Sequence, residues 1–545
     1  MAKNKKYDAI IIGGGTNGLL CGAYLARAGL KTLILEKQLE MGGGLLTEEI
    51  AFPGFYHDTH AIYMTMLDYA PAVQDLELTT KHGLELIFPE VQVASLGKDG
   101  SSICLYNDVD RTCESFRRFS EKDAKTFKEL ALKFQGWVDD FLAPYTYVAP
   151  IPTLELAAAM ERTEMGKEMF ALTEETPKDL IETWFENERI RALMLDAVCF
   201  WGLDPEQSGL GYLVPLYFNR SYNNRIVKGG THQLSQGLTR DFLQHGGHSK
   251  TVQIIDHIII DNGQAKGIKM YDGTVYEANT VISTLDMNQT FFKYIGEKIV
   301  EKDFAESIKM WQWEHWSFLS AHISIDGPPL QFKAAVKNPD IEKALIYTVG
   351  CESIADFMEQ HEDIKAGRLG KLIIHSSFPT VFDPSRIRSG GGTVALLQIH
   401  VPYDIREGKK WEDYSYDDRQ TLADRMMDAL LEYASDFDRE SILVKYVSSP
   451  WDIENKLPDM VKGSFKQGLY HPLQMGYMRP NAECSNHRSP IKGLYMGGAC
   501  THPGGTILLA NGFLAAEVVL EDLGRDKWWG THEIVSKARA KGMPL

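Results

Sequence analysis

The chain has 545 residues, 44% of them hydrophobic, which is enough for two or three domains or one large interleaved pair. Its formal net charge of −17 argues against a nucleic-acid partner, because phosphate binding needs basic patches. No apolar run approaches the roughly 20 residues of a transmembrane helix, and only peripheral contact with a membrane stays open. Because no apolar leader precedes the first strand, we expect a cytoplasmic protein. The seven cysteines form no C-x-x-C pair, and no zinc-type spacing occurs, so we expect free thiols and no metal.

The N-terminal stretch, residues 7–36, predicts a dinucleotide-binding unit of strand, helix and strand. Residues 7–12 are a short β-branched run, residues 16–28 have apolar side chains at helical spacing, and residues 31–35 form a second apolar run. An isolated glycine-rich turn lacks these flanking elements. Their order therefore favours a nucleotide site over a simple turn.

Three glycines and one acid carry the expected binding. Gly13, Gly15 and Gly18 follow the spacing G-x-G-x-x-G, and Glu36 follows the last glycine by 18 residues. The first glycine permits the tight turn, the second lets the backbone approach a pyrophosphate, and the third lets the helix pack on the strand. The N–H groups at the start of the helix face the phosphates, and Glu36 accepts hydrogen bonds from a ribose.

Further nucleotide-binding features recur much later in the chain. After Gly229-Gly230 the pattern predicts a helix, followed by short strands with Asn-Gly and Asp-Gly hairpin turns. Near the C-terminus, a strand over 493–496 leads into a glycine turn and then an apolar helix over about 506–523. A simple N-terminal Rossmann domain does not need these later segments.

We therefore predict an α/β fold in which a Rossmann-like FAD-binding domain is assembled from discontinuous segments and joined to a mixed α+β substrate domain. The expected FAD-binding domain comprises residues 1–75, 225–300 and 471–530. The expected substrate domain comprises residues 76–224 and 301–470.

Three sequence blocks resemble FAD-dependent flavoproteins of the amine oxidase and phytoene desaturase-like superfamily. They are IIIGGGTNGLLCGAYLARAGLKTLILEK with GGGLLTEEIAFPGF, then KGGTHQLSQGL through GIKMYDGTVYEANTVIST, and finally MRP…HRSPIKGLYMGGACTHPGG. Within the superfamily, the chain looks most similar to the branch that contains bacterial-type carotenoid desaturases and the pyridine nucleotide-disulphide oxidoreductase domain-containing protein 2. The blocks cover about a quarter of the chain, in family order.

The resemblance implies FAD as the cofactor and assigns it a set of contacts beyond the first glycine loop. Two glycines lie along the diphosphate and ribityl chain, one backbone position contacts the adenine, and the C-terminal block approaches the flavin. In this order the residues are Gly43 and Gly44; Ile255; and Gly498, Ala499, Thr506, Ile507 and Leu508.

The chain departs from the family pattern at two motifs. Many relatives have Gly-Gly-Arg where this chain has Gly43-Gly44 without the arginine, which removes one charge facing the diphosphate. The last motif is often H-P-G-G-G, but here Thr506 follows the second glycine. We expect the hydroxyl of Thr506 to cap the following helix more readily than to bind the flavin.

Candidate catalytic residues are His60, His57 and His502. The first two lie in the segment HDTH, which in related flavoproteins passes toward the flavin, and His502 lies in the flavin motif. Each also has a structural interpretation, as part of a hydrogen-bonded loop or as a brace of the glycine turn. The aromatic run at 311–318, WQWEHWSF, predicts a strand with one apolar face, either core or a wall around an apolar substrate.

The function expected from these features is FAD-dependent dehydrogenation of a C–C bond in an apolar or alicyclic substrate, either a carotenoid precursor or a smaller cyclic ketone or acid, by hydride transfer to flavin N5. Two alternatives remain, a flavin amine oxidase and a non-catalytic FAD-binding interaction protein. Because no second G-x-G-x-x-G occurs, the electron acceptor is expected to be oxygen, a quinone or another carrier rather than bound nicotinamide.

Overall fold

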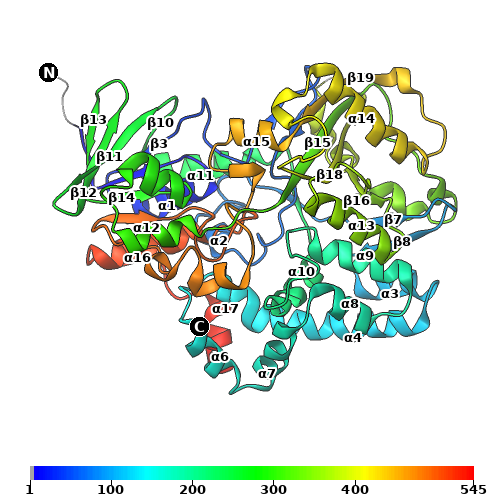
Figure 1. Cartoon of the computed structure of the whole chain (residues 1–545), viewed down its shortest axis with the longest axis horizontal. Coiled ribbons are helices and arrows are strands. Elements are labelled where there is room, and N and C mark those ends of the chain that lie inside the picture. Colours follow the sequence, from blue (N-terminus) through cyan, green and yellow to red (C-terminus); the bar gives the residue numbers. More distant parts are fainter. Residues whose placement is uncertain (1–4, 389) are drawn as a thin grey trace.

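The computed structural model describes residues 5–388 and 390–545, built around two large sheets. In Figure 1 the nucleotide-type sheet lies on the left, the second sheet on the upper right, and a lobe of helices below. Among the described residues, no helix combines the length and the apolar character that crossing a bilayer requires.

The first sheet has five parallel strands in the order β10-β3-β2-β14-β20. They come from three separate stretches of the chain, which is the discontinuous Rossmann-like arrangement expected from the sequence. The bounds are β2 Ala9–Ile12, β3 Thr32–Leu35, β10 His248–Lys250, β14 Val281–Ser283 and β20 Leu494–Met496. Three helices pack together on this sheet in one apolar cluster, namely α1 Thr16–Arg27, α11 His232–Gln244 and α16 Asn511–Asp522.

A four-stranded sheet in the order β1-β13-β12-β11 flanks the first sheet. Its strands are β1 Lys5–Lys6, β11 Ile255–Asp261, β12 Gln264–Met270 and β13 Val275–Glu277. Asn262 and Gly263 join β11 to β12 with φ values of 50° and 72°. Positive φ at both central residues is the requirement of a type I′ hairpin turn, as the Asn-Gly signal predicted.

The second large sheet has seven strands in the order β19-β15-β18-β17-β16-β7-β8. All neighbours are antiparallel except β16 and β7, so the sheet is mixed. The bounds are β7 Val91–Leu96, β8 Ser102–Tyr106, β15 Trp316–Ile325, β16 Ala344–Val349, β17 Ile374–Ser377, β18 Thr393–Pro402 and β19 Ile442–Ser448. Helix α14, Tyr416–Leu431, buries Met426, Met427 and Leu430 in the cluster that includes one face of this sheet.

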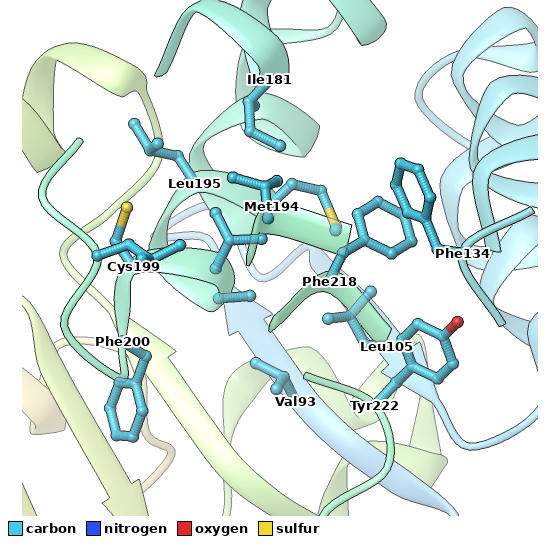
Figure 2. Packing of buried hydrophobic residues seen from close by; sticks show 14 of the residues in the cluster. Val93, Leu105, Phe134, Ile181, Met194, Leu195, Cys199, Phe200, Phe218 and Tyr222 are labelled. Carbon is cyan, nitrogen blue, oxygen red and sulfur yellow. The ribbon is translucent and has the colours of Figure 1, made fainter. Parts of the chain in front are cut away.

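The helical lobe packs against the second sheet through its largest apolar cluster. Figure 2 shows side chains of the helices, among them Phe134, Met194 and Phe218, gathered near Leu105 and Val93 of the strands. The lobe comprises α3 Val109–Arg117, α4 Glu121–Trp137, α8 Pro177–Trp184, α9 Glu188–Cys199 and α10 Val214–Arg220. Shorter helices are α2 Pro71–Asp75, α5 Ala143–Thr146, α6 Thr153–Met160, α7 Glu164–Ala171, α12 Lys302–Lys309, α13 Ile354–Lys365, α15 Pro450–Lys456 and α17 Glu533–Ala540.

The predicted strand over 311–318 is wrong in its first half, since β15 begins only at Trp316. The preceding residues are bound to another loop instead. The backbone N–H of Gln312 donates to the side chain of Gln474 (2.6 Å), and its carbonyl accepts from Leu469 N (3.0 Å). Trp311 therefore packs beneath the Arg479 guanidinium rather than on the sheet.

The predicted C-terminal helix starts five residues later than expected, at Asn511. Thr506, Ile507 and Leu509 have φ values of 75°, 56° and 53°, which a right-handed helix cannot contain. The predicted capping role of Thr506 is accordingly wrong, because Ala510 occupies the N-cap without a side-chain bond. The Asn511 side chain instead donates to the carbonyl of Thr501 (3.0 Å), fixing the loop before the helix.

Candidate active site

The glycine turn after β2 is too crowded for side chains at the positions that the motif identifies. A Cβ on Gly18 would lie 1.9 Å from the carbonyl oxygen of Gly13, and one on Gly13 would lie 2.4 Å from Thr284 Oγ1. Gly13 also has a φ of 95°. Glycine is therefore required here for helix packing and for the turn itself.

Glu36 stands at the end of β3 and holds the same turn from the other side. Its Oε2 accepts from the backbone N–H of Gly14 at 2.6 Å, and its Oε1 accepts from Gln38 N at 2.7 Å. The side chain is buried, yet it lines a cavity. The acid predicted to bind a ribose is thus fixed in orientation beside the glycine loop.

A long nucleotide cavity of about 1280 Å³, its open mouth included, runs along the ends of β2 and β3. It contains Gly13, Gly15, Glu36 and Gly43, and it extends past Ile255, the position expected to contact the adenine. The other lining residues are Ile12, Leu35, Lys37, Gln38, Gln253, Ile254, Asp256, Tyr271, Thr284, Leu285, Gln289, Lys293, Tyr294, Leu457, Pro458 and Asp459.

A second cavity of about 1270 Å³, again with its mouth included, joins the first and reaches the seven-stranded sheet. We call it the reaction cavity. Four residues line both cavities: Gly15, Gly43, Thr284 and Asp459. The predicted flavin contacts in the reaction cavity are Gly44, Ala499, Thr506, Ile507 and Leu508.

Gly498 has a different surrounding from those contacts. A Cβ at this position would lie 2.3 Å from the carbonyl oxygen of Thr284, so the glycine allows β20 to approach the chain after β14. The two joined cavities, the glycine cradle and the oriented Glu36 together fit an extended dinucleotide such as FAD, with its adenosine half beside Glu36.

The reaction cavity has a largely aromatic wall on the side of the second sheet. Phe318 of β15 is joined by Phe200 and Trp201 from the end of α9, by Tyr63, and by Phe465. Phe200 and Trp201 lie edge to face, with ring centroids 4.8 Å apart. Such a wall binds apolar ring compounds or polyenes and excludes water.

Of the three candidate histidines, only His60 is among the described residues that line the reaction cavity. Its Nε2 is buried without a hydrogen-bond partner in the described residues. Burial lowers the pKa of His60 to about 3, and the nearby Lys456 ammonium adds to the effect, so the imidazole is neutral at neutral pH.

The structure places the other two histidines elsewhere. His57 Nε2 lies 3.2 Å from Ser324 Oγ. His502 lines a separate cavity, where its Nε2 donates to the carbonyl of Tyr145 at 3.1 Å. Burial lowers the pKa of each to about 3.

Several lining residues carried no recognisable sequence signal. Phe465, Gln467, Ser320, Gln398 and Asp459 come from three different loops or strands of the second half of the chain. Their approach to the glycine loop depends on how the two sheets are joined, and no local spacing expresses that.

The only cluster of metal-ligand type found among the described residues lies outside these cavities. Ligand atoms of Glu206, His361 and Glu362 lie within 4.8 Å of one another. Lys365 Nζ is 2.8 Å from Glu206, so this carboxylate already has a cationic partner.

Comparison with known proteins agrees with this geometry. Residues 11–76 match the model of an NAD(P)-binding Rossmann-like domain. Over its whole length the chain is 38% identical to one of the polypeptides of the limonene dehydrogenase of Castellaniella defragrans, also covering 100% of that polypeptide. It is 28% identical to pyridine nucleotide-disulfide oxidoreductase domain-containing protein 2 of Rattus norvegicus, over 95% of this chain and 94% of the relative.

More distant matches extend the group. The chain is 22% identical to a 4,4'-diapophytoene desaturase of a Methylomonas species, with 91% of each protein covered. Its fold matches cyclohexylamine oxidase of Brevibacterium oxydans with a TM-score of 0.58 and 15% identity, over 95% of this chain and 100% of that structure. At that identity the likeness concerns the fold alone.

Proposed function

Because the chain belongs to the phytoene desaturase-like family of flavoprotein oxidoreductases, we propose that it binds FAD along the two joined cavities and dehydrogenates an apolar, alicyclic substrate. The observation that carries the proposal is the junction of the cavities. Four residues are shared between a glycine-lined nucleotide trough and an aromatic-walled chamber. A ring compound in that chamber would lie next to the flavin end of the cofactor.

The pattern of relatives favours a small ring over a long polyene. The 38% match is named for limonene, a cyclic monoterpene hydrocarbon, whereas identity to the carotenoid enzyme is 22%. The reaction cavity must also hold the flavin within its volume of about 1270 Å³. We therefore assign a substrate of about monoterpene size and rank a carotenoid precursor second.

Bound FAD would supply the hydride acceptor for the reaction. The aromatic wall, Phe318 and Phe465 included, would hold the ring and exclude water. His60 is our candidate for the proton acceptor, since its neutral imidazole has a buried Nε2 free of partners in the described residues. The reduced enzyme would then pass its electrons to oxygen, a quinone or another carrier, in the cytoplasm.

Anaerobic absorbance of the purified holoprotein tests this proposal. We expect the flavin band near about 450 nm to bleach on addition of an alicyclic compound from a panel of limonene, carvone, cyclohexylamine and phytoene. Bleaching by cyclohexylamine alone would establish an amine oxidase, and bleaching by phytoene alone a carotenoid desaturase. A protein without FAD, or a band that none of the four bleaches, would contradict the proposal.

The role of His60 has its own control. We expect His60→Gln to slow bleaching by about 100-fold or more, the usual contribution of a general base. His257→Gln changes a half-exposed histidine on the β11 strand and should leave the rate unaltered. Equal rates for wild type and His60→Gln would remove His60 from the mechanism.

A further inference from the structure

The aromatic wall of the reaction cavity contains one adjacent pair of polar side chains on the second sheet. Ser320 of β15 and Gln398 of β18 are directly opposite each other in register, and both line the cavity. Both are buried, with exposed fractions of 4% and 7%. Gln398 Nε2 donates to Ser320 Oγ at 3.0 Å. The pair is therefore a single polar point within an otherwise apolar surface.

This one bond leaves most of the hydrogen-bonding capacity of the pair unused. A glutamine amide has two N–H donors and a carbonyl acceptor, and a serine hydroxyl has one donor and two lone pairs. Within the described residues no other side-chain bond is formed by either group. Burying such groups unsatisfied costs about 1–3 kcal/mol each, so their place in an apolar wall calls for a ligand.

The neighbouring polar residue in the same row is already occupied. His375 of β17 is opposite Gln398, but its Nε2 lies 3.0 Å from both carboxylate oxygens of Asp196. It is also covered by Phe200, whose ring centroid is 4.7 Å away. The donors available at this wall are thus the hydroxyl of Ser320 and the second N–H of Gln398.

Two converging donors match the two lone pairs of one carbonyl oxygen. We propose that the substrate is an alicyclic ketone whose carbonyl oxygen binds between Ser320 Oγ and Gln398 Nε2. The inference rests on the proposed dehydrogenation and deepens it by naming the substrate class. It distinguishes this chain's substrate from the hydrocarbon for which its 38% identical relative is named.

A bound carbonyl makes the reaction a desaturation next to that group. The proton leaves the carbon adjacent to the carbonyl, and a base takes it; the hydride leaves the next carbon for bound FAD; a C=C bond forms between the two carbons. The substrate loses two electrons and the flavin gains them. Donors on the carbonyl oxygen stabilise the negative charge that develops there as the proton leaves.

Calorimetric titration of the holoprotein with two ligands of one skeleton tests the assignment. Limonene is the hydrocarbon, and carvone is the same ring system with a carbonyl in place of one CH₂. We expect carvone to bind at least about tenfold more tightly than limonene. Ser320→Ala and Gln398→Leu should each lower that ratio by about threefold to tenfold, chiefly by weakening carvone.

Matched variants separate this effect from damage to the fold. Ser448 of β19 is opposite Ser320 on its other side, is equally buried and is not among the residues lining the cavity, so Ser448→Ala should keep the ratio. Ser320→Thr retains the hydroxyl and should also keep it. Because both side chains would contact one oxygen, the double variant should lose less than the two single losses combined.

The inference is overturned if Ser320→Ala and Gln398→Leu keep the wild-type ratio, if limonene binds more tightly than carvone, or if neither ligand binds. These outcomes differ from failure of the proposed function. Bleaching by limonene with an unchanged ratio would keep the dehydrogenase and remove the ketone. A ratio that depends on both residues without any bleaching would keep the carbonyl site and remove the reaction.

Discussion

At the scale of single residues, Asp459 is the most unusual group at the junction of the two cavities. Its carboxylate receives one hydrogen bond, from Gln467 Nε2 at 2.7 Å. Burial raises the pKa of Asp459 to about 6, and the charges of Asp286 and Glu36 add to the rise, whereas the bond from Gln467 opposes it. Asp459 therefore gains its charge within the physiological range.

This pKa predicts a specific pH dependence of stability. The folded protein holds the Asp459 proton up to about pH 6 while the unfolded chain releases it near pH 3.8, so the free energy of unfolding falls as pH rises between these values. The loss amounts to about 3 kcal/mol. Asp459→Asn should remove it, giving a smaller decline in urea midpoint of the apoprotein between about pH 4.5 and about pH 7.5.

The exposed Asp526 provides the control for that experiment, since Asp526→Asn should follow the wild-type pH profile. An Asp459→Asn profile parallel to wild type would show that the carboxyl ionises normally. Residues such as Asp459 could not be assigned from the sequence. The glycines and Glu36 could, because their chemistry depends on spacing within one short βαβ unit.

At the scale of elements, helix α1 depends on a close approach that one methyl group would prevent. Gly18 lies in its first turn, where an added Cβ meets backbone that cannot rotate away. By contrast, a Cβ on Gly136, in the last turn of α4, meets nothing within 4 Å. The same substitution should therefore have opposite effects in the two helices.

We expect Gly18→Ala to lower the unfolding free energy by about 3 kcal/mol or more and to abolish FAD retention, because the helix must move away from the glycine turn. Gly136→Ala should stabilise the protein by up to about 1 kcal/mol through helix propensity. Thermal unfolding and the flavin content after gel filtration measure both. A Gly18→Ala protein that keeps its melting temperature and its flavin would contradict the packing argument.

The elements also show where prediction from sequence ends. α1 and the hairpin at Asn262-Gly263 were predictable, since their residues interact with near neighbours in the chain. The first half of 311–318 failed because Gln312 binds the 469–474 loop, about 160 residues away. The start of α16 failed because three left-handed residues precede it, which side-chain spacing does not reveal.

At the scale of the whole molecule, the chain passes between the two large sheets several times. It runs from β3 in the first sheet to β7 in the second, returns at β10, leaves again between β14 and β15, and returns after β19 to form β20. The limits we predict for the two domains imply the same exchange of segments. Neither sheet is completed by one continuous piece of chain, so we expect the two to unfold together.

Ligand binding at one sheet should therefore stabilise the other. ADP is a probe that needs only the nucleotide cavity. At about 100 times its dissociation constant it should raise the unfolding free energy of the apoprotein by about 2.7 kcal/mol. Far-ultraviolet circular dichroism should report the same upward shift as the fluorescence of Trp316 and Trp201, which lie at the second sheet. A tryptophan transition that ADP leaves unmoved would show independent halves.

The contact between Gly15 and Gly43 has a consequence for how this sequence can diversify. A Cβ on Gly43 would lie 2.9 Å from the α-carbon of Gly15, so the obstruction is main chain and no choice of residue at position 15 relieves it. Compensating double substitutions, which rescue many crowded pairs, are closed to this one. In a library randomised at both positions and selected for flavin retention, position 43 should return glycine in every genetic background.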